Sequence, residues 1–237
     1  MTSQFPTQHR GTTQSTSSSV AARGTPVGPT RKRMTAEQRK AQVIDAAIAL
    51  FGSHGLKGTT TRALAEAAGV SEATIFKHFP TKDDLYAAAF ERRTFVGTAQ
   101  LVTELQGYVD RQDDEGLLRR LIGAILDGYE RDRDLHRMLL YAWLEQGPTE
   151  NNRMWSQMRR SPLFEFLDRY VRQRQAEGVF RADATGLLTA ALVALPVNHA
   201  ISTKLYGIES EFPDEQVIDT YARLLLDGVR GGMAMGR

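Results

Sequence analysis

The chain has 237 residues, of which 41% are hydrophobic and 24% are charged, an ordinary composition for a soluble globular protein of one or two domains. It has no cysteine, which excludes disulfide frameworks and thiolate metal sites, and its 5 histidines lack the spacing of a helical metal site. The charge is uneven: residues 1–94 hold 13 Lys or Arg against 7 Asp or Glu, and the remainder holds 17 against 21. A basic first part suggests a polyanion partner, although a solvated basic surface would give the same count.

Residues 1–33 are rich in Ser, Thr, Gln, Gly and Pro, so we expect a disordered tail. The tail has no apolar core of a signal peptide, and the longest apolar stretch, Leu187–Val197, is too short to span a bilayer. A cytoplasmic protein without a membrane partner is therefore expected. For residues 1–30 we favour a solvated leader, whereas Arg31, Lys32 and Arg33 directly precede the first helix and could reach DNA.

Strand-like alternation is nearly absent and Ala, Leu, Arg and Glu dominate, so the sequence predicts an all-α fold. The first helix is expected to begin at Thr35, which can form a capping box with Gln38. Gly52 and Gly55 are expected to end it. Its buried stripe follows the spacing i, i+3, i+4, i+7 and consists of Ile44, Ala47, Ile48 and Phe51.

Residues 58–79, GTTTRALAEAAGVSEATIFKHF, predict two short helices joined by a tight turn. The second helix should begin at Thr60 or Thr61, and Gly69 should take the left-handed conformation that ends it. Ser71 is positioned to cap a third helix, and Thr81 to cap a fourth beyond Pro80. This layout is typical of a helix-turn-helix, so residues 34–82 are predicted to be a three-helix DNA-binding head.

The third helix is expected to enter the major groove of DNA, where residues near its start reach base edges. Its predicted contacts are Ser71, Glu72, Ala73, Thr74, Lys77 and His78, with Lys82 and a threonine hydroxyl at the start of the second helix on phosphates. Glu72 could accept from a cytosine amino group, but we favour a role as a negative charge on the helix dipole. Each basic residue alone would more often be a solvated charge, and it is their grouping that favours binding.

The pattern T-T-x-x-L-A-x-x-A-G-V-S-x-A-T-I-F-x-H-F-x-x-K-x-x-L, within Thr35–Phe90, closely resembles the signature of the TetR family of bacterial transcription regulators. The resemblance places eight residues on family positions that contact DNA: Thr61, Ser71, Ala73, Thr74, Phe76, Lys77, His78 and Lys82. The family usually has Tyr in place of Phe76, which removes a phenol-to-phosphate bond, and often has Gly in place of Ala73. Neither departure removes the motif, but with both of them the operator sequence cannot be read from the family pattern.

Residues 83–237 are predicted to form a larger helical body, with breaks near 113–116, 132–134, 147–148, 178–183 and 207–213. The family resemblance implies that this body holds a ligand pocket. Aromatic and Met residues are dense there, and pockets for small molecules are mainly apolar. Plain core packing is the alternative for each residue alone. The candidate ligand-binding residues are Tyr129, His136, Tyr141, Trp143, Trp155, Met158 and Phe166, and Glu145 could add a polar group.

The resemblance also implies a homodimer built by the last two long helices. Small residues that permit close helix approach follow one stripe of the first of them. Packing within the chain is the alternative. The candidate interface residues are Leu187, Ala191, Ala194, Leu195, Asn198, Tyr221 and Leu225.

The resulting hypothesis is a homodimeric repressor that binds a pseudo-palindromic operator in double-stranded DNA and is released by a small hydrophobic or aromatic effector. One alternative is a ligand-independent regulator or architectural protein with a solid helical core. A helical enzyme with an accessory head is less favoured, because no nucleophile–base pair, phosphate loop or metal spacing is found in the sequence. No cofactor is expected.

Overall fold

The computed structural model describes residues 34–145, 147, 156 and 158–230, with the side chains of residues 94–97 left out. Within these ranges the regular structure is helical, apart from one isolated β-bridge between Phe180 and Arg230. The predicted all-α fold is therefore confirmed. The tail 1–33, with Arg31, Lys32 and Arg33, and the candidate ligand residue Trp155 lie outside the described residues.

The first helix, α1 (Ala36–Gly58), begins as the sequence predicts. The Thr35 amide donates to Gln38 Oε1 at 2.9 Å, and the Gln38 amide donates to Thr35 Oγ1 at 3.1 Å. The expected end at Gly52 or Gly55 is only partly right. Gly55 has φ +71° and interrupts the helix, but a further turn follows it as far as Gly58.

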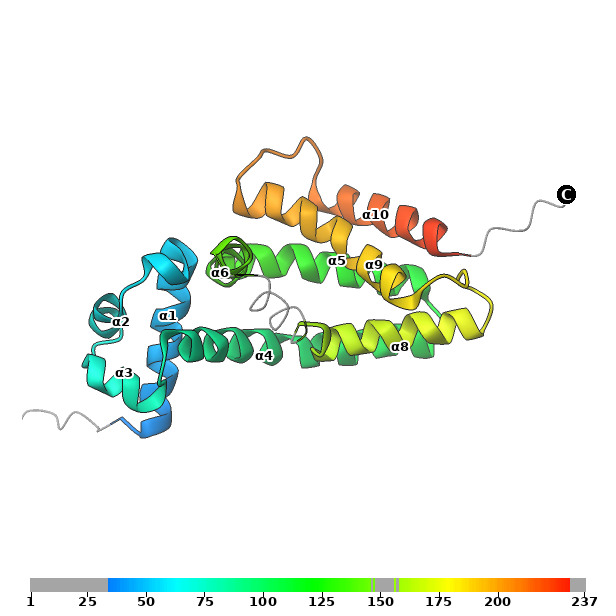
Figure 1. Cartoon of the computed structure of the whole chain (residues 1–237). Coiled ribbons are helices and arrows are strands. Elements are labelled where there is room, and N and C mark those ends of the chain that lie inside the picture. Colours follow the sequence, from blue (N-terminus) through cyan, green and yellow to red (C-terminus); the bar gives the residue numbers. More distant parts are fainter. Residues whose placement is uncertain (1–33, 146, 148–155, 157, 231–237) are drawn as a thin grey trace, which may run out of the picture. The chain divides into compact units, whose positions relative to one another are not determined.

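Helices α2 (Thr61–Ala67) and α3 (Glu72–His78) meet at the predicted tight turn (Figure 1). Gly69 has φ +60°, the left-handed region that favours glycine. The Ser71 hydroxyl accepts from the Thr74 amide at 3.2 Å and so caps α3. Thr81 caps the next helix in a capping box with Asp84. These local signals place the helix-turn-helix as the sequence predicts.

The body contains α4 (Lys82–Asp110), α5 (Asp114–Arg131), α6 (Arg133–Glu145), α8 (Pro162–Ala176), α9 (Thr185–Ala200), the π-helix η1 (Ile201–Leu205) and α10 (Asp214–Val229). Helices α5, α9 and α10 pack on one another, and α8 packs on α4 (Figure 1). The breaks between α4 and α5, α5 and α6, α8 and α9, and η1 and α10 fall where the sequence predicts them.

Buried apolar residues form two clusters. The head core joins α1, α2, α3 and the first half of α4, and it also includes Leu135, Met138 and Ala142 of α6. The body core joins the second half of α4 with α5, α8, α9 and α10. Helix α6 therefore belongs to the body by sequence but to the head by packing, and the division at residue 82 stays a prediction.

Helix α6 lies very close to α1. A Cβ atom on Gly52 would stand 2.5 Å from the backbone oxygen of Asp134, at the start of α6. The Tyr86 hydroxyl on α4 donates to the Met138 carbonyl of α6 at 2.5 Å, and the Tyr86 ring lies 5.1 Å from that of Phe51. Burial, and secondly the charge of Glu145, raise the pKa of Tyr86. Sequence periodicity did not predict this docking.

Helices α9 and η1 together run 21 residues from Thr185 to Leu205, and their most apolar window has mean hydropathy 1.4 with 22% of it buried. The helix is longer than the apolar stretch Leu187–Val197, so length and composition alone would allow it to cross a membrane. Mostly buried core helices of soluble proteins pass the same test of length and composition, and α9 packs against α5, α8 and α10.

Candidate nucleic-acid interface

Helix α3 exposes one face and buries the other. Ile75 and Phe79 are 3% exposed and anchor the helix in the head core, which also contains Leu64 of α2. The outward face carries the residues expected on DNA: Ser71, Glu72, Ala73, Phe76 and Lys77 are exposed, and Thr74 and His78 are half-buried. One buried anchor within the seven-residue helix and one directly after it therefore fix which side chains a major groove would meet.

Two hydroxyls at the start of α3 are already paired. Ser71 Oγ and Thr74 Oγ1 lie 2.9 Å apart, and either oxygen can be the donor. Whichever donates, one hydroxyl hydrogen remains for a phosphate or base oxygen. Glu72 lies in the first turn of α3, where a negative charge interacts favourably with the helix dipole. This position suits the role of a dipole-stabilising charge that we prefer for Glu72.

The predicted phosphate contacts differ in exposure and in the hydrogen bonds that they already make. Lys77 is exposed, whereas the half-buried Lys82 donates to the Thr59 carbonyl at 2.9 Å. That bond uses one of three ammonium hydrogens, so Lys82 can also meet a phosphate. Thr61 is half-buried at the start of α2, and Thr60 is the residue that caps this helix by accepting from Ala63 at 3.1 Å.

Two basic residues of the head were not among the predicted contacts. The Lys40 ammonium lies 5.9 Å from the ring centre of Phe79, at the end of α3. The side chain of Arg62 on α2 is 81% exposed and pairs with Glu66 at 3.0 Å. The motif has no signal for Lys40, because its contact joins residues far apart in the sequence.

The candidate ligand residues are distributed over several places. Tyr129 and His136 stack with ring centres 3.7 Å apart, and His136 Nδ1 lies 2.8 Å from the Asp132 carbonyl. Burial lowers the pKa of His136 and raises that of Tyr129 to about 12, so both are neutral near pH 7. A neutral His136 that donates through Nδ1 keeps Nε2 as an acceptor.

The other ligand candidates do not join this pair. Tyr141 donates to the Ser53 carbonyl of α1 at 3.4 Å, and Glu145 also faces α1. Phe166 is 1% exposed within the body core, which suits the alternative of core packing. Trp143 is 53% exposed and Met158 is half-buried.

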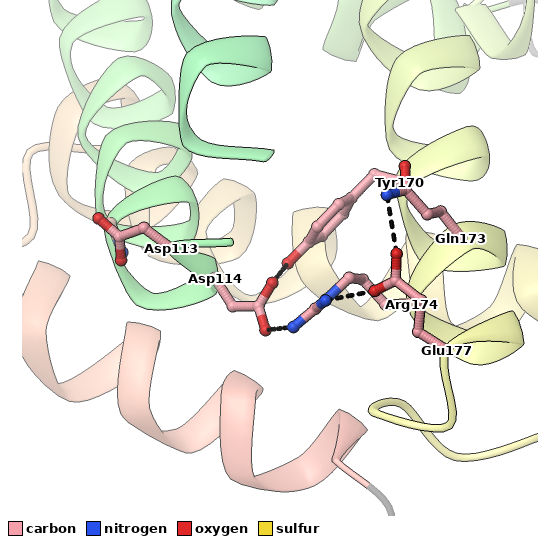
Figure 2. A network of polar contacts seen from close by, with 7 residues as sticks. Asp113, Asp114, Tyr170, Gln173, Arg174 and Glu177 are labelled. Carbon is pink, nitrogen blue, oxygen red and sulfur yellow. Dashed lines mark hydrogen bonds and ion pairs between the residues drawn. The ribbon is translucent and has the colours of Figure 1, made fainter. Parts of the chain in front are cut away.

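A buried polar cluster links α5 to α8 (Figure 2). Asp114 accepts from the Tyr170 hydroxyl at 2.8 Å and from Arg174 Nη2 at 2.6 Å, and Arg174 Nη1 also pairs with Glu177. Burial opposes the charge of Arg174, but hydrogen bonds to the two carboxylates outweigh it and raise its pKa. Burial and the bond to Asp114 raise the pKa of Tyr170. The charges are paired with one another, so the cluster joins helices rather than offering a free reactive group.

The candidate interface residues divide into exposed and buried ones. Leu187, Ala191, Ala194 and Asn198 form an exposed stripe on α9 at helical spacing, and Leu187 is 73% exposed. Leu195 and Tyr221 are half-buried, with the Tyr221 hydroxyl 3.3 Å from His199 Nδ1. Leu225 is only 9% exposed because it packs in the body core, and its neighbour Leu224 is 59% exposed.

The head matches a known family. The sequence model of the family "Bacterial regulatory proteins, tetR family" matches residues 43–89, which include α2 and α3. The nucleoid occlusion factor SlmA of Citrobacter koseri is 31% identical over 171 residues, covering 69% of this chain and 82% of that protein. The chain belongs to the TetR family. It is therefore a DNA-binding transcriptional regulator of the TetR type.

Other regulators are similar to part of the chain or to its fold. The HTH-type transcriptional repressor SCO4008 of Streptomyces coelicolor is 29% identical over 114 residues, covering 48% of this chain and 54% of that one. FadR from Bacillus halodurans has TM-score 0.64 at 20% identity, covering 87% and 100% of the two chains. FadR from Bacillus subtilis, in complex with stearoyl-CoA, has TM-score 0.65 at 14% identity, covering 80% and 99%. The solved structures share the TetR fold alone.

Proposed function

We propose that this TetR-family regulator is a homodimeric, cytoplasmic repressor that a small hydrophobic or aromatic effector releases from a pseudo-palindromic operator. The observation that carries the proposal is the presence of two exposed surfaces on one chain. Helix α3 presents Thr74, Lys77 and neighbouring polar groups outward, and α9 presents an exposed apolar stripe on the same chain. The first surface fits DNA, and the second fits another copy.

The dimer is supported by what α9 and α10 leave uncovered. Leu187, Ala191, Ala194 and Asn198 lie along one face of α9, and Leu224 is exposed on α10. Small residues allow two helices to approach closely, and a two-fold interface uses the same patch on both copies. In such a dimer two recognition helices would enter successive major grooves, about 34 Å apart.

The effector is supported by the half-buried pair Tyr129 and His136, which offers an aromatic surface beside an imidazole acceptor. The shared fold of Bacillus subtilis FadR holds stearoyl-CoA in its structure, so an acyl thioester is a suitable first probe. The ligand would act by binding more tightly to a form that cannot fit both half-sites.

A second function is favoured by the similarity to SlmA. That relative is named a nucleoid occlusion factor, and it matches 69% of this chain at 31% identity, well beyond the head. The corresponding proposal is a ligand-independent DNA-binding protein with a solid body core.

One experiment separates the two proposals. Operators are selected from random DNA by the full-length protein and footprinted, with the oligomeric state measured in parallel. We expect a dimer in solution and protection of two half-sites about one helical turn apart. Stearoyl-CoA and a panel of aromatic compounds are then tested for release of DNA and for a raised melting temperature. A monomer that protects a single half-site would contradict the dimer, and a panel that changes neither readout would favour the ligand-independent protein.

A further inference from the structure

The break in α1 leaves polar backbone groups that need partners. Gly55, at φ +71°, separates the long first part of α1 from its last turn. Carbonyls before such a break and amides after it lose their helical partners, because the ladder of hydrogen bonds is interrupted. Three such groups are bound by side chains of another helix: the carbonyl of Ser53 and the amides of Leu56 and Lys57.

Helix α6 supplies both kinds of partner from one face. Glu145 Oε2 accepts from the Leu56 amide at 2.7 Å and from the Lys57 amide at 3.0 Å. Tyr141, four residues earlier and therefore on the same side of α6, donates to the Ser53 carbonyl at 3.4 Å. A carboxylate meets the amides and a hydroxyl meets the carbonyl, as capping requires. We name Tyr141 and Glu145 the α6 cap.

The fit between the cap and Gly55 is close. A Cβ atom at position 55 would stand 2.0 Å from Glu145 Oε1, and the positive φ is unfavourable for any other residue. The backbone therefore requires glycine at 55, and a Cβ atom there would force the Glu145 carboxylate to move from its present position.

The cap is directly connected to the DNA-binding motif. Thr59 donates from Oγ1 to the Gly55 carbonyl at 2.6 Å, and its own carbonyl accepts from Lys82 at 2.9 Å. The next residue, Thr60, caps α2. The turn that precedes α2 and contacts the start of α4 is therefore bonded to the break that Glu145 caps.

We propose that the α6 cap is a detachable contact that holds the helix-turn-helix in its DNA-binding position. Movement of α6 withdraws Glu145 and Tyr141, leaves the Leu56 and Lys57 amides without an acceptor, and loosens the junction between α1 and α2. The α6 cap rests on the proposed function, because it gives an effector response a path to the operator site. Glu145 acts here as a positioning residue.

The test measures amide exchange and operator affinity in the full-length protein. With Glu145→Ala we expect the Leu56 and Lys57 amides to exchange at least about tenfold faster, and operator binding to weaken about tenfold. Glu145→Gln retains a carbonyl acceptor and should remain within about threefold of wild type in both readouts. Glu91→Ala, on the exposed face of α4, removes the same charge and should leave the exchange of both amides unchanged.

Unchanged exchange in Glu145→Ala would overturn the cap, and faster exchange with full operator affinity would overturn its regulatory role. If Glu145→Ala does not fold, Tyr141→Phe removes only the bond to Ser53 and is expected to shift both readouts in the same direction by a smaller factor. A wild-type protein that selects no operator would refute the proposed function, while the amide exchange would still decide whether the cap exists.

Discussion

Two joints between helices use a carboxylate in contrasting ways. At the α1–α6 joint, the half-buried Glu145 accepts from two backbone amides beside a glycine. At the α5–α8 joint, the buried Asp114 accepts from a tyrosine and an arginine that are themselves buried (Figure 2). Both tie together segments far apart in the sequence, but only the first can open without leaving a buried charge unpaired.

This difference indicates separate roles. Opening the α5–α8 joint would leave Asp114, Tyr170 and Arg174 without their hydrogen-bond partners in the protein interior. We therefore expect this joint to remain closed in every functional state. Opening the α1–α6 joint releases two neutral amides, one of them on the exposed Lys57, at a cost that ligand binding can supply. The protein thus has one joint suited to stability and one suited to regulation.

The largest expected effect is the loss of the arginine. Arg174→Ala leaves Asp114 buried without its cation, and we expect a decrease of about 3–5 kcal/mol in the free energy of unfolding. Urea denaturation measures it. Operator affinity of the folded fraction should stay near wild type, and a loss below about 1 kcal/mol would show that the joint opens to water.

Two glycines with matching backbones sharpen the comparison. Gly55 and Gly178 have φ +71° and +74°, but only a Cβ atom at Gly55 meets another atom, Glu145 Oε1, at 2.0 Å. Gly178→Ala should cost about 1 kcal/mol of unfolding free energy through its backbone alone. Gly55→Ala should cost about 2 kcal/mol more, because it displaces the carboxylate.

The control for this pair is the same substitution in a Glu145→Ala background. There the excess cost of Gly55→Ala should largely disappear, since the clashing atom is gone. Strictly additive free energies would show that the two residues do not touch.

Two buried tyrosines provide a smaller test. Tyr170→Phe removes the hydroxyl bound to Asp114 and should lower the free energy of unfolding by about 2 kcal/mol. Tyr86→Phe removes the hydroxyl bound to the Met138 carbonyl and should lower it by about 1 kcal/mol. Only Tyr86→Phe should also weaken operator binding, because only Tyr86 links α4 to α6. Equal DNA affinity in the two variants would contradict the separation of roles.

The smallest effect on stability is expected at the DNA surface. Lys77→Ala removes an exposed cation, so the free energy of unfolding should change by less than about 0.5 kcal/mol. The slope of log affinity against log salt should decrease in magnitude by about one unit. Binding measured across a salt series checks this, and an unchanged slope would remove Lys77 from the phosphate contacts.

Much of the head could be read from local sequence. The capping box at Thr35, the left-handed Gly69 and the caps at Ser71 and Thr81 are all confirmed. Each depends on residues within a few positions of one another, so the spacing in the chain already contains the geometry. The outward face of α3 follows from the same periodicity.

The body was less predictable from the same reasoning. An aromatic residue on an amphipathic helix can face a core, a cavity or another helix, and periodicity does not distinguish these. Phe166 lies in the body core, Tyr141 meets α1, and Tyr129 pairs with His136. Leu225 and Leu224 are adjacent, yet tertiary packing covers the first and leaves the second exposed.

The sequence by itself determined the all-α fold, the helix boundaries around the DNA-binding motif and membership of a regulator family, because these depend on short-range patterns. Only the tertiary structure decided that α6 packs into the head core and that Glu145 caps the break at Gly55. That contact joins residues 89 positions apart in the chain, so no local pattern contains it. Its existence depends on how two helices pack, which only the folded chain defines.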